Sequence, residues 1–70
     1  MNKCAQYSFY VRQHHDGTPW ILAEWVSGED ILEGTLGFNL SPGTTLRQAE
    51  ELASKMREHI RELALTSFLG

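Results

Sequence analysis

The 70-residue sequence predicts an α+β fold in which a three-stranded antiparallel β-meander packs against one long C-terminal helix, in the order β-β-β-α. Two periodicities carry this prediction. Apolar and polar residues alternate in the first part of the chain, as in a strand with one buried face. In the last third, apolar residues recur in steps of three and four, which is the spacing of one helical stripe. These residues are Leu46, Ala49, Ala53, Met56, Ile60 and Leu63.

The first two strands are expected to form a hairpin. Tyr7, Phe9 and Val11 alternate with polar neighbours, and residues 20–26 are rich in aromatic and branched side chains. A three-residue loop, residues 15–17, places Val11 opposite Ile21 and requires a left-handed conformation that Gly17 can adopt. This register directs one apolar set from each strand towards the helix.

A third strand is predicted over residues 31–40. A two-residue turn at Gly28-Glu29 would place Leu36 beside Ile21 and Leu32 beside Trp25. The segment Ser41-Pro42-Gly43 then ends the strand, because the residue before a proline is biased away from the helical conformation.

The helix is predicted to run from Thr45 to about residue 65. Thr45 and Gln48 have the spacing of a capping box, with capping at Thr44 as the near alternative. No Gly or Pro interrupts residues 45–65, which gives about five turns. The predicted core consists of Phe9, Ile21, Trp25, Leu36, Phe38, Leu46, Ala49, Leu52, Ala53, Met56, Ile60 and Leu63.

Composition and charge indicate one small domain, residues 1–70. The chain is 41% hydrophobic and 21% charged, with a net charge of −3 that disfavours a sequence-independent grip on nucleic acid. Cys4 is the only cysteine, so no intrachain disulfide is expected. The first residues lack a long apolar run, so we expect neither a signal peptide nor a membrane span, and a cytoplasmic location.

The face of the sheet opposite the helix is the candidate working surface. Antiparallel sheets usually make such a face polar, whereas this register places a contiguous apolar patch there. Its apolar members are Tyr10, Trp20, Leu22, Val26 and Ile31. In the alternative interpretation, Arg12 lies across Trp20, acidic side chains break up the patch, and nothing binds. The candidate binding residues are Tyr10, Arg12, Trp20, Leu22, Glu24 and Glu33.

No pattern of catalytic residues is evident. His14, His15 and Asp16 are adjacent, so they point to different sides and are better explained as a turn than as a metal site. Glu24 opposite Glu33 could form a carboxylate pair, but nothing in the sequence indicates a cleft around it. We therefore predict no catalytic residue, no metal and no cofactor.

Part of the chain resembles HicB-type antitoxins. Residues 7–11 lead through Asp16-Gly17 to residues 20–23, and residues 43–50 open a helix with the pattern G-x-T-L-x-x-A. The resemblance covers about half the chain. It departs from the family because residues 26–36 form a longer link, no strand is predicted after the helix, and no DNA-binding domain follows. It implies binding of a small RNA-cleaving toxin.

Three functions remain open. The first is a non-enzymatic interaction module that acts as a homodimer or with a small protein partner. The second is a nucleic-acid-binding domain in which Tyr10, Trp20 and Arg12 contact bases. Double-stranded-RNA-binding and integrase arm-binding domains also place three strands before a helix, but they use basic side chains that this chain lacks. The third is a small-molecule or enzymatic site at a subunit junction with Glu24, Glu33 and His14.

Overall fold

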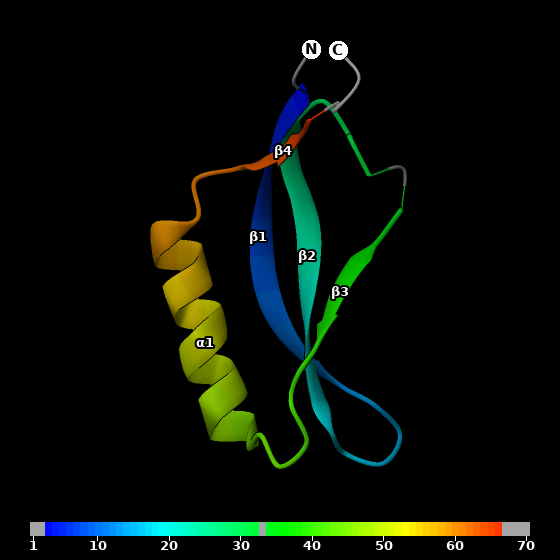
Figure 1. Cartoon of the computed structure of the whole chain (residues 1–70), viewed down its shortest axis with the longest axis vertical. Helices are drawn as coiled ribbons and strands as arrows, with labels where there is room; N and C mark the ends of the chain where they lie inside the picture. Colours follow the sequence, from blue (N-terminus) through cyan, green and yellow to red (C-terminus); the bar gives the residue numbers. More distant parts are fainter. Residues whose placement is uncertain (1–2, 33, 67–70) are drawn as a thin grey trace.

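The computed structural model describes residues 3–32 and 34–66. Along the chain it contains β1 (Lys3–Gln13), β2 (Pro19–Gly28), β3 (Leu36–Asn39), α1 (Leu46–His59) and β4 (Leu63–Leu65). The strands form one antiparallel sheet in the order β3-β2-β1-β4, and α1 lies beside β1 while β3 lies on the far side of β2 (Figure 1). The predicted α+β class, with an antiparallel sheet and one helix, is confirmed.

The β1–β2 hairpin has the predicted register. Val11 lies opposite Ile21 and Tyr10 opposite Leu22. Gly17 has a φ of 88°, the left-handed conformation that the loop requires. Near the other end of the hairpin the register shifts by one residue, so that Val26 is the extra residue of a β-bulge.

The third strand is shorter than predicted, and the prediction of a tight turn at Gly28-Glu29 is wrong. Strand β2 continues pairing with β1 as far as Gly28, and β3 begins only at Leu36. Leu36 therefore lies opposite Ala23 instead of Ile21, which faces Phe38. The error has a physical cause. Ile31 and Leu32 lie in a loop and pack half-buried against the core, and apolar residues that pack in this way are also typical of a strand.

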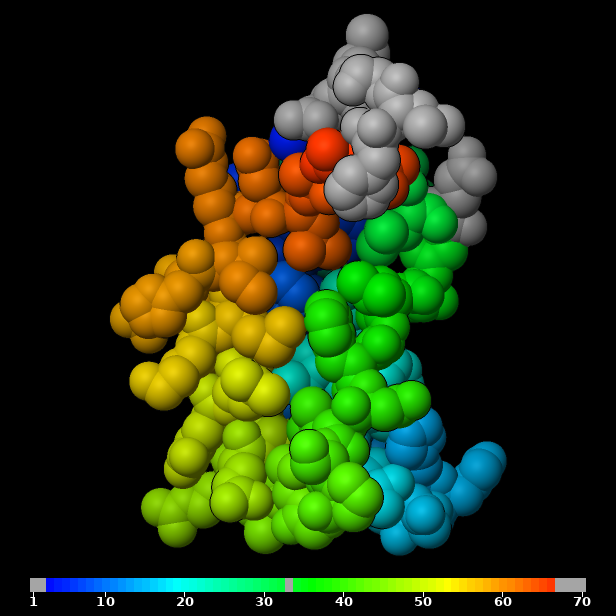
Figure 2. Space-filling model, viewed as in Figure 1, coloured from blue at the N-terminus to red at the C-terminus, as the bar shows by residue number. Residues whose placement is uncertain are grey.

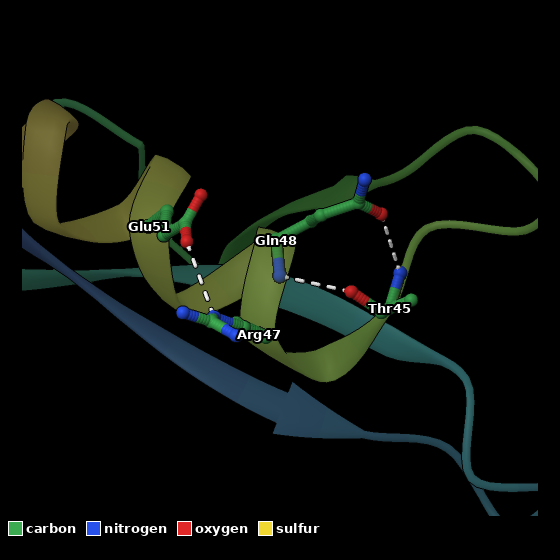
Figure 3. Close-up of polar contacts among 4 residues, drawn as sticks. All are labelled: Thr45, Arg47, Gln48 and Glu51. Atoms are coloured by element: carbon green, nitrogen blue, oxygen red, sulfur yellow. Dashed lines mark hydrogen bonds and ion pairs between the residues drawn. The ribbon is translucent and has the colours of Figure 1, made fainter.

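The helix begins as predicted. The Thr45 hydroxyl accepts a hydrogen bond from the Gln48 amide at 3.1 Å, and the Gln48 side chain accepts one from the Thr45 amide at 2.9 Å (Figure 3). This capping box satisfies two amides that the first turn leaves without helical partners. In the same first turn, Arg47 forms an exposed ion pair with Glu51 of the next turn at 3.5 Å (Figure 3).

The helix ends at His59, earlier than predicted, and a fourth strand follows it. Ile60 is extended, with φ −91° and ψ 111°, and β4 then pairs with Lys3–Ala5 of β1. Ile60 and Leu63 pack against the core from this non-helical segment. Because their spacing of three residues continues the helical period, the sequence pattern predicts a helix beyond its actual end at His59.

The core lies between α1 and the strands β1 and β2. Phe9, Ile21, Ala49 and Ala53 are fully buried as predicted, and Leu36, Phe38, Met56, Ile60 and Leu63 are partly buried. Trp25 was predicted to be inside but is 47% exposed, because the pairing of β3 with β2 stops at Ala23. Leu46 and Leu52, at 46% and 44% exposed, lie on the flanks of the apolar stripe.

The helix covers only part of the inner sheet face. Within the described residues, α1 approaches β1 and β2 closely but not β3. Atoms of β1 and β2 are visible in the space between α1 and β3 (Figure 2). The inner side chains of β3 are consequently only half-buried.

A buried tyrosine ties the β2–β3 loop to the core. Tyr7 is 6% exposed, and its hydroxyl donates to a carboxylate oxygen of Asp30 at 3.3 Å. Burial raises the pKa of Tyr7 above its ordinary value of 10.0, and the neighbouring Asp30 charge and this hydrogen bond raise it further. The contact fixes a loop that forms no strand.

Truncation of Phe9 should be far more damaging than truncation of Trp25. Phe9 is 0% exposed, and removal of a buried aromatic commonly costs about 3–5 kcal/mol. That is a large part of the roughly 5–15 kcal/mol by which domains are stable. Chemical denaturation of Phe9→Ala and Trp25→Ala should show this order. A Trp25→Ala variant less stable than Phe9→Ala would contradict the arrangement of the core.

Alkaline pH should destabilise the fold through Tyr7. The raised pKa of Tyr7 means that the unfolded chain loses this proton at a lower pH than the folded chain. The contribution of Tyr7 to the free energy of unfolding is therefore fully present below pH about 10. It falls as the pH rises from there through the pKa of Tyr7 in the folded chain. Denaturation curves across this range should show the decline, and Tyr7→Phe should flatten it. An unchanged slope in Tyr7→Phe would assign the decline to other groups.

Candidate functional site on the open sheet face

The open face is the side of the sheet that α1 does not cover. Alternate residues of each strand project onto it, and the pairing arranges them in cross-strand rows. The rows are Arg12–Trp20–Asn39, Tyr10–Leu22–Gly37 and Ser8–Glu24. Residues from three strands thus form one continuous surface.

The structure brings five of the six predicted binding residues together on this face. Tyr10 is 39% exposed, Arg12 and Glu24 are exposed, and Trp20 and Leu22 are half-buried. Glu33 lies outside the described residues, and so does its predicted pairing with Glu24, which lies opposite Ser8.

The predicted apolar patch is smaller than expected. Ile31 leaves it because its side chain packs against the core. Val26 is 54% exposed at the bulge, away from the central rows. Gly37, which has no side chain to add to the patch, lies opposite Leu22. Tyr10, Trp20 and Leu22 remain as the apolar centre.

Two arginines flank the ring of Tyr10. The guanidinium carbon of Arg12 lies 5.8 Å from the ring centroid, and that of Arg57 lies 6.0 Å from it. Arg57 comes from α1, donates a hydrogen bond to the Phe9 carbonyl, and so reaches around the edge of β1 to this face. Both distances fit a cation–π contact, which places positive charge at one side of the apolar centre.

Arg57 was not identified from the sequence. The available signal was its position four residues after Ala53, which places it beside the apolar stripe of the helix. Arg12 also differs from expectation, because its guanidinium lies over Tyr10 and not across Trp20.

Trp20 covers a glycine of the neighbouring strand. A Cβ atom on Gly37 would lie 3.0 Å from the Trp20 ring, so the ring rests directly on this backbone. The ring also stacks with His14, at a centroid distance of 5.7 Å and an interplanar angle of 21°. Trp20 thus has a structural role at the edge strand besides its place on the open face.

The His14-His15-Asp16 segment serves the hairpin. A ring nitrogen of His14 lies 3.3 Å from the Asn39 side-chain oxygen. Asp16 accepts hydrogen bonds from the Thr18 hydroxyl at 2.7 Å and amide at 3.0 Å, and these bonds lower the pKa of Asp16. No group of three metal-ligating side chains occurs within the residues that the structure describes.

A shallow hollow lies on the exposed side of α1, away from this face. Its lining mixes both signs of charge, and the Arg47–Glu51 ion pair belongs to it. It contains no aromatic side chain. The lining residues are Arg47, Glu50, Glu51, Ser54, Lys55 and Glu58.

Comparison of the chain with protein-family models, curated proteins and solved structures gave no match in any of the three. Over residues 3–32 and 34–66, no helix has both the length and the apolar character needed to cross a membrane.

Removal of the Trp20 ring should destabilise the sheet. Trp20→Ala would remove the contacts of the ring with the Gly37 backbone and the His14 ring, and we expect a loss of about 1–3 kcal/mol in the free energy of unfolding. Trp20→Phe keeps a ring over Gly37 and should lose less. Urea denaturation of both variants measures this order. Equal stability of wild type and Trp20→Ala would show that the ring does not support β3.

Proposed function

We propose that the chain is a non-enzymatic protein-interaction module that binds its partner through the open sheet face. The observation that carries the proposal is the uncovered apolar centre of Tyr10, Trp20 and Leu22. Contiguous apolar surface in a small domain often marks an interaction site, and aromatic side chains at the centre of such a surface commonly contribute most to binding. The arginines beside Tyr10 add a charged rim of the kind found around protein interfaces.

A protein partner agrees with the charge of the molecule. The net charge is −3, and Glu24 lies on the same face as Arg12, so a phosphate backbone would meet both signs of charge. The partner in this proposal is a second copy of the chain or another small protein. We place the module in the cytoplasm, where a lone cysteine stays reduced.

An antitoxin-like role fits the same surface. One difference from the HicB pattern is removed, because a strand, β4, does follow the helix. On this proposal the partner is a small RNA-cleaving toxin, and the open face neutralises it by contact. The long link between β2 and β3 still differs from the family.

Nucleic-acid binding is the second candidate. Two guanidinium groups beside Tyr10 form a place where a base could stack while a phosphate contacts arginine. The two candidates respond differently to salt. Phosphate contacts weaken steeply as salt rises, whereas an apolar protein contact is far less affected.

Leu22→Ser and Tyr10→Ser should weaken partner binding without unfolding the domain. Loss of an apolar anchor commonly reduces affinity at least about tenfold, which corresponds to about 1.4 kcal/mol. Immobilised wild type and variants would be exposed to extract of the native host, and the retained proteins quantified by mass spectrometry at low and high salt. A protein retained at high salt by wild type and lost by both variants is the expected result.

Leu52→Ser is the matched control. Leu52 is 44% exposed on the helix, so this variant makes the same substitution away from the open face. It should retain the partner as wild type does. If Leu22→Ser and Tyr10→Ser retained the partner as well as wild type does, the open face would be rejected as the working surface. Steeply salt-sensitive binding of a single-stranded oligonucleotide, lost in Arg12→Gln, would favour the second candidate.

A further inference from the structure

Strand β3 forms an outer edge of the sheet. One hydrogen bond of the β1–β2 hairpin determines which backbone groups of β3 point away from the sheet. The His14 amide donates to the Thr18 carbonyl at 2.9 Å, so even-numbered residues of the hairpin direct their backbone groups between β1 and β2. Because this direction alternates along a strand, Ile21 and Ala23 direct theirs towards β3. Their partners in β3, Phe38 and Leu36, direct their own backbone groups towards β2. Gly37 and Asn39, the residues between and beyond those partners, therefore direct amide and carbonyl groups away from the sheet.

This edge is uncovered. Gly37 and Asn39 are both exposed, and β3 contains no charged residue. Over the described residues, no strand pairs with β3 on this side and α1 does not approach it. Proteins usually protect such an edge with charge, proline or a covering element, because unpaired backbone groups bind other strands.

The edge of β1 shows such protection. Arg57 donates a hydrogen bond to the Phe9 carbonyl, and Arg12 donates one to the Val11 carbonyl at 3.1 Å. Phe9 is fully buried beneath this cover. The chain thus has one edge guarded by guanidinium groups and one left bare.

The bare edge is complementary to itself. Its inward side chains, Leu36, Phe38 and the following Leu40, are apolar, symmetric in sequence about Phe38 and only half-buried. If two β3 strands align antiparallel with Phe38 at the two-fold axis, Gly37 of each strand faces Asn39 of the other. These are the residues whose backbone groups point outward. In the same register Leu36 faces Leu40 across the axis.

We propose that β3 pairs with β3 of a second copy of the chain in this register, joining two sheets into one. The pairing satisfies the outward backbone groups and places the two Phe38 side chains at the close, non-hydrogen-bonded position. Each chain carries a net charge of −3, but the charges lie off the strand, so the contact itself brings no like charges together. The open faces of both copies stay uncovered, so the pairing does not use the apolar centre of the proposed partner site.

Asn39→Pro tests the pairing. Proline removes the outward amide of Asn39, and this amide has no role in the β2–β3 ladder, so the monomer should keep its fold. Asn39→Ala is the matched control, because it loses the same side chain and the contact with His14 but keeps the amide. Sedimentation equilibrium over a concentration series should show self-association of wild type and Asn39→Ala, weakened at least tenfold in Asn39→Pro.

Hydrogen exchange gives a readout that needs no variant. The Gly37 and Asn39 amides of wild type should exchange more slowly in concentrated than in dilute solution, while the Tyr10 amide, which already faces β2, should not change. A wild type that stays monomeric, or that associates equally well as Asn39→Pro, overturns the proposal. Dissociation by Leu22→Ser together with undiminished association of Asn39→Pro would assign the dimer contact to the open face instead.

Discussion

The close contact of α1 with two of the strands decides which part of the sheet is buried. Ala49 and Ala53 of the helix are fully buried, as are Phe9 and Ile21 of the sheet, and Ala53 belongs to the same core cluster as these two large side chains. Small side chains on the helix allow its backbone to approach the sheet, so that the two large side chains fill the space between them. A chain of 70 residues can form only one such core. The helix is committed to β1 and β2, and β3 receives no helix of its own.

Contacts made by large side chains support the parts that the helix does not reach. Trp20 rests on the Gly37 backbone from the open face, Tyr7 holds the β2–β3 loop through Asp30, and Arg57 covers the edge of β1. Each of these uses a large side chain to supply area or hydrogen bonds that a small core lacks. Aromatic residues on the open face are therefore partly structural, and their presence alone does not measure how much of that face is available for binding.

The sequence predicted the β1–β2 hairpin well because two independent signals agree there. Side-chain alternation fixes which residues face inward, and the three-residue loop ending at Gly17 fixes which residues are paired. The helix start had a similar double signal in Thr45 and Gln48. These local rules are sufficient to place Tyr10, Arg12, Trp20, Leu22 and Glu24 on one face, as the structure does.

Local rules failed where irregular backbone contributes to the core. Ile31 and Leu32 reach the core from a loop, and Ile60 reaches it from extended chain after the helix. Periodicity assigns apolar residues to helices and strands, so it does not predict core residues that lie in irregular segments. The approach of Arg57 to Tyr10 depends on how the helix lies against β1, which is a tertiary property with only a weak trace in the sequence.

The open face and the bare edge meet at Trp20. Its ring lies in the apolar centre of the face and also covers Gly37, one of the two residues whose backbone groups form the edge. A change at Trp20 therefore alters both surfaces, and binding data from such a variant could not be assigned to either one. Leu22 lies opposite Gly37 without covering it in this way, and the Asn39 amide belongs to the edge alone. These two positions separate a contact made by side chains of the face from a contact made by the backbone of β3.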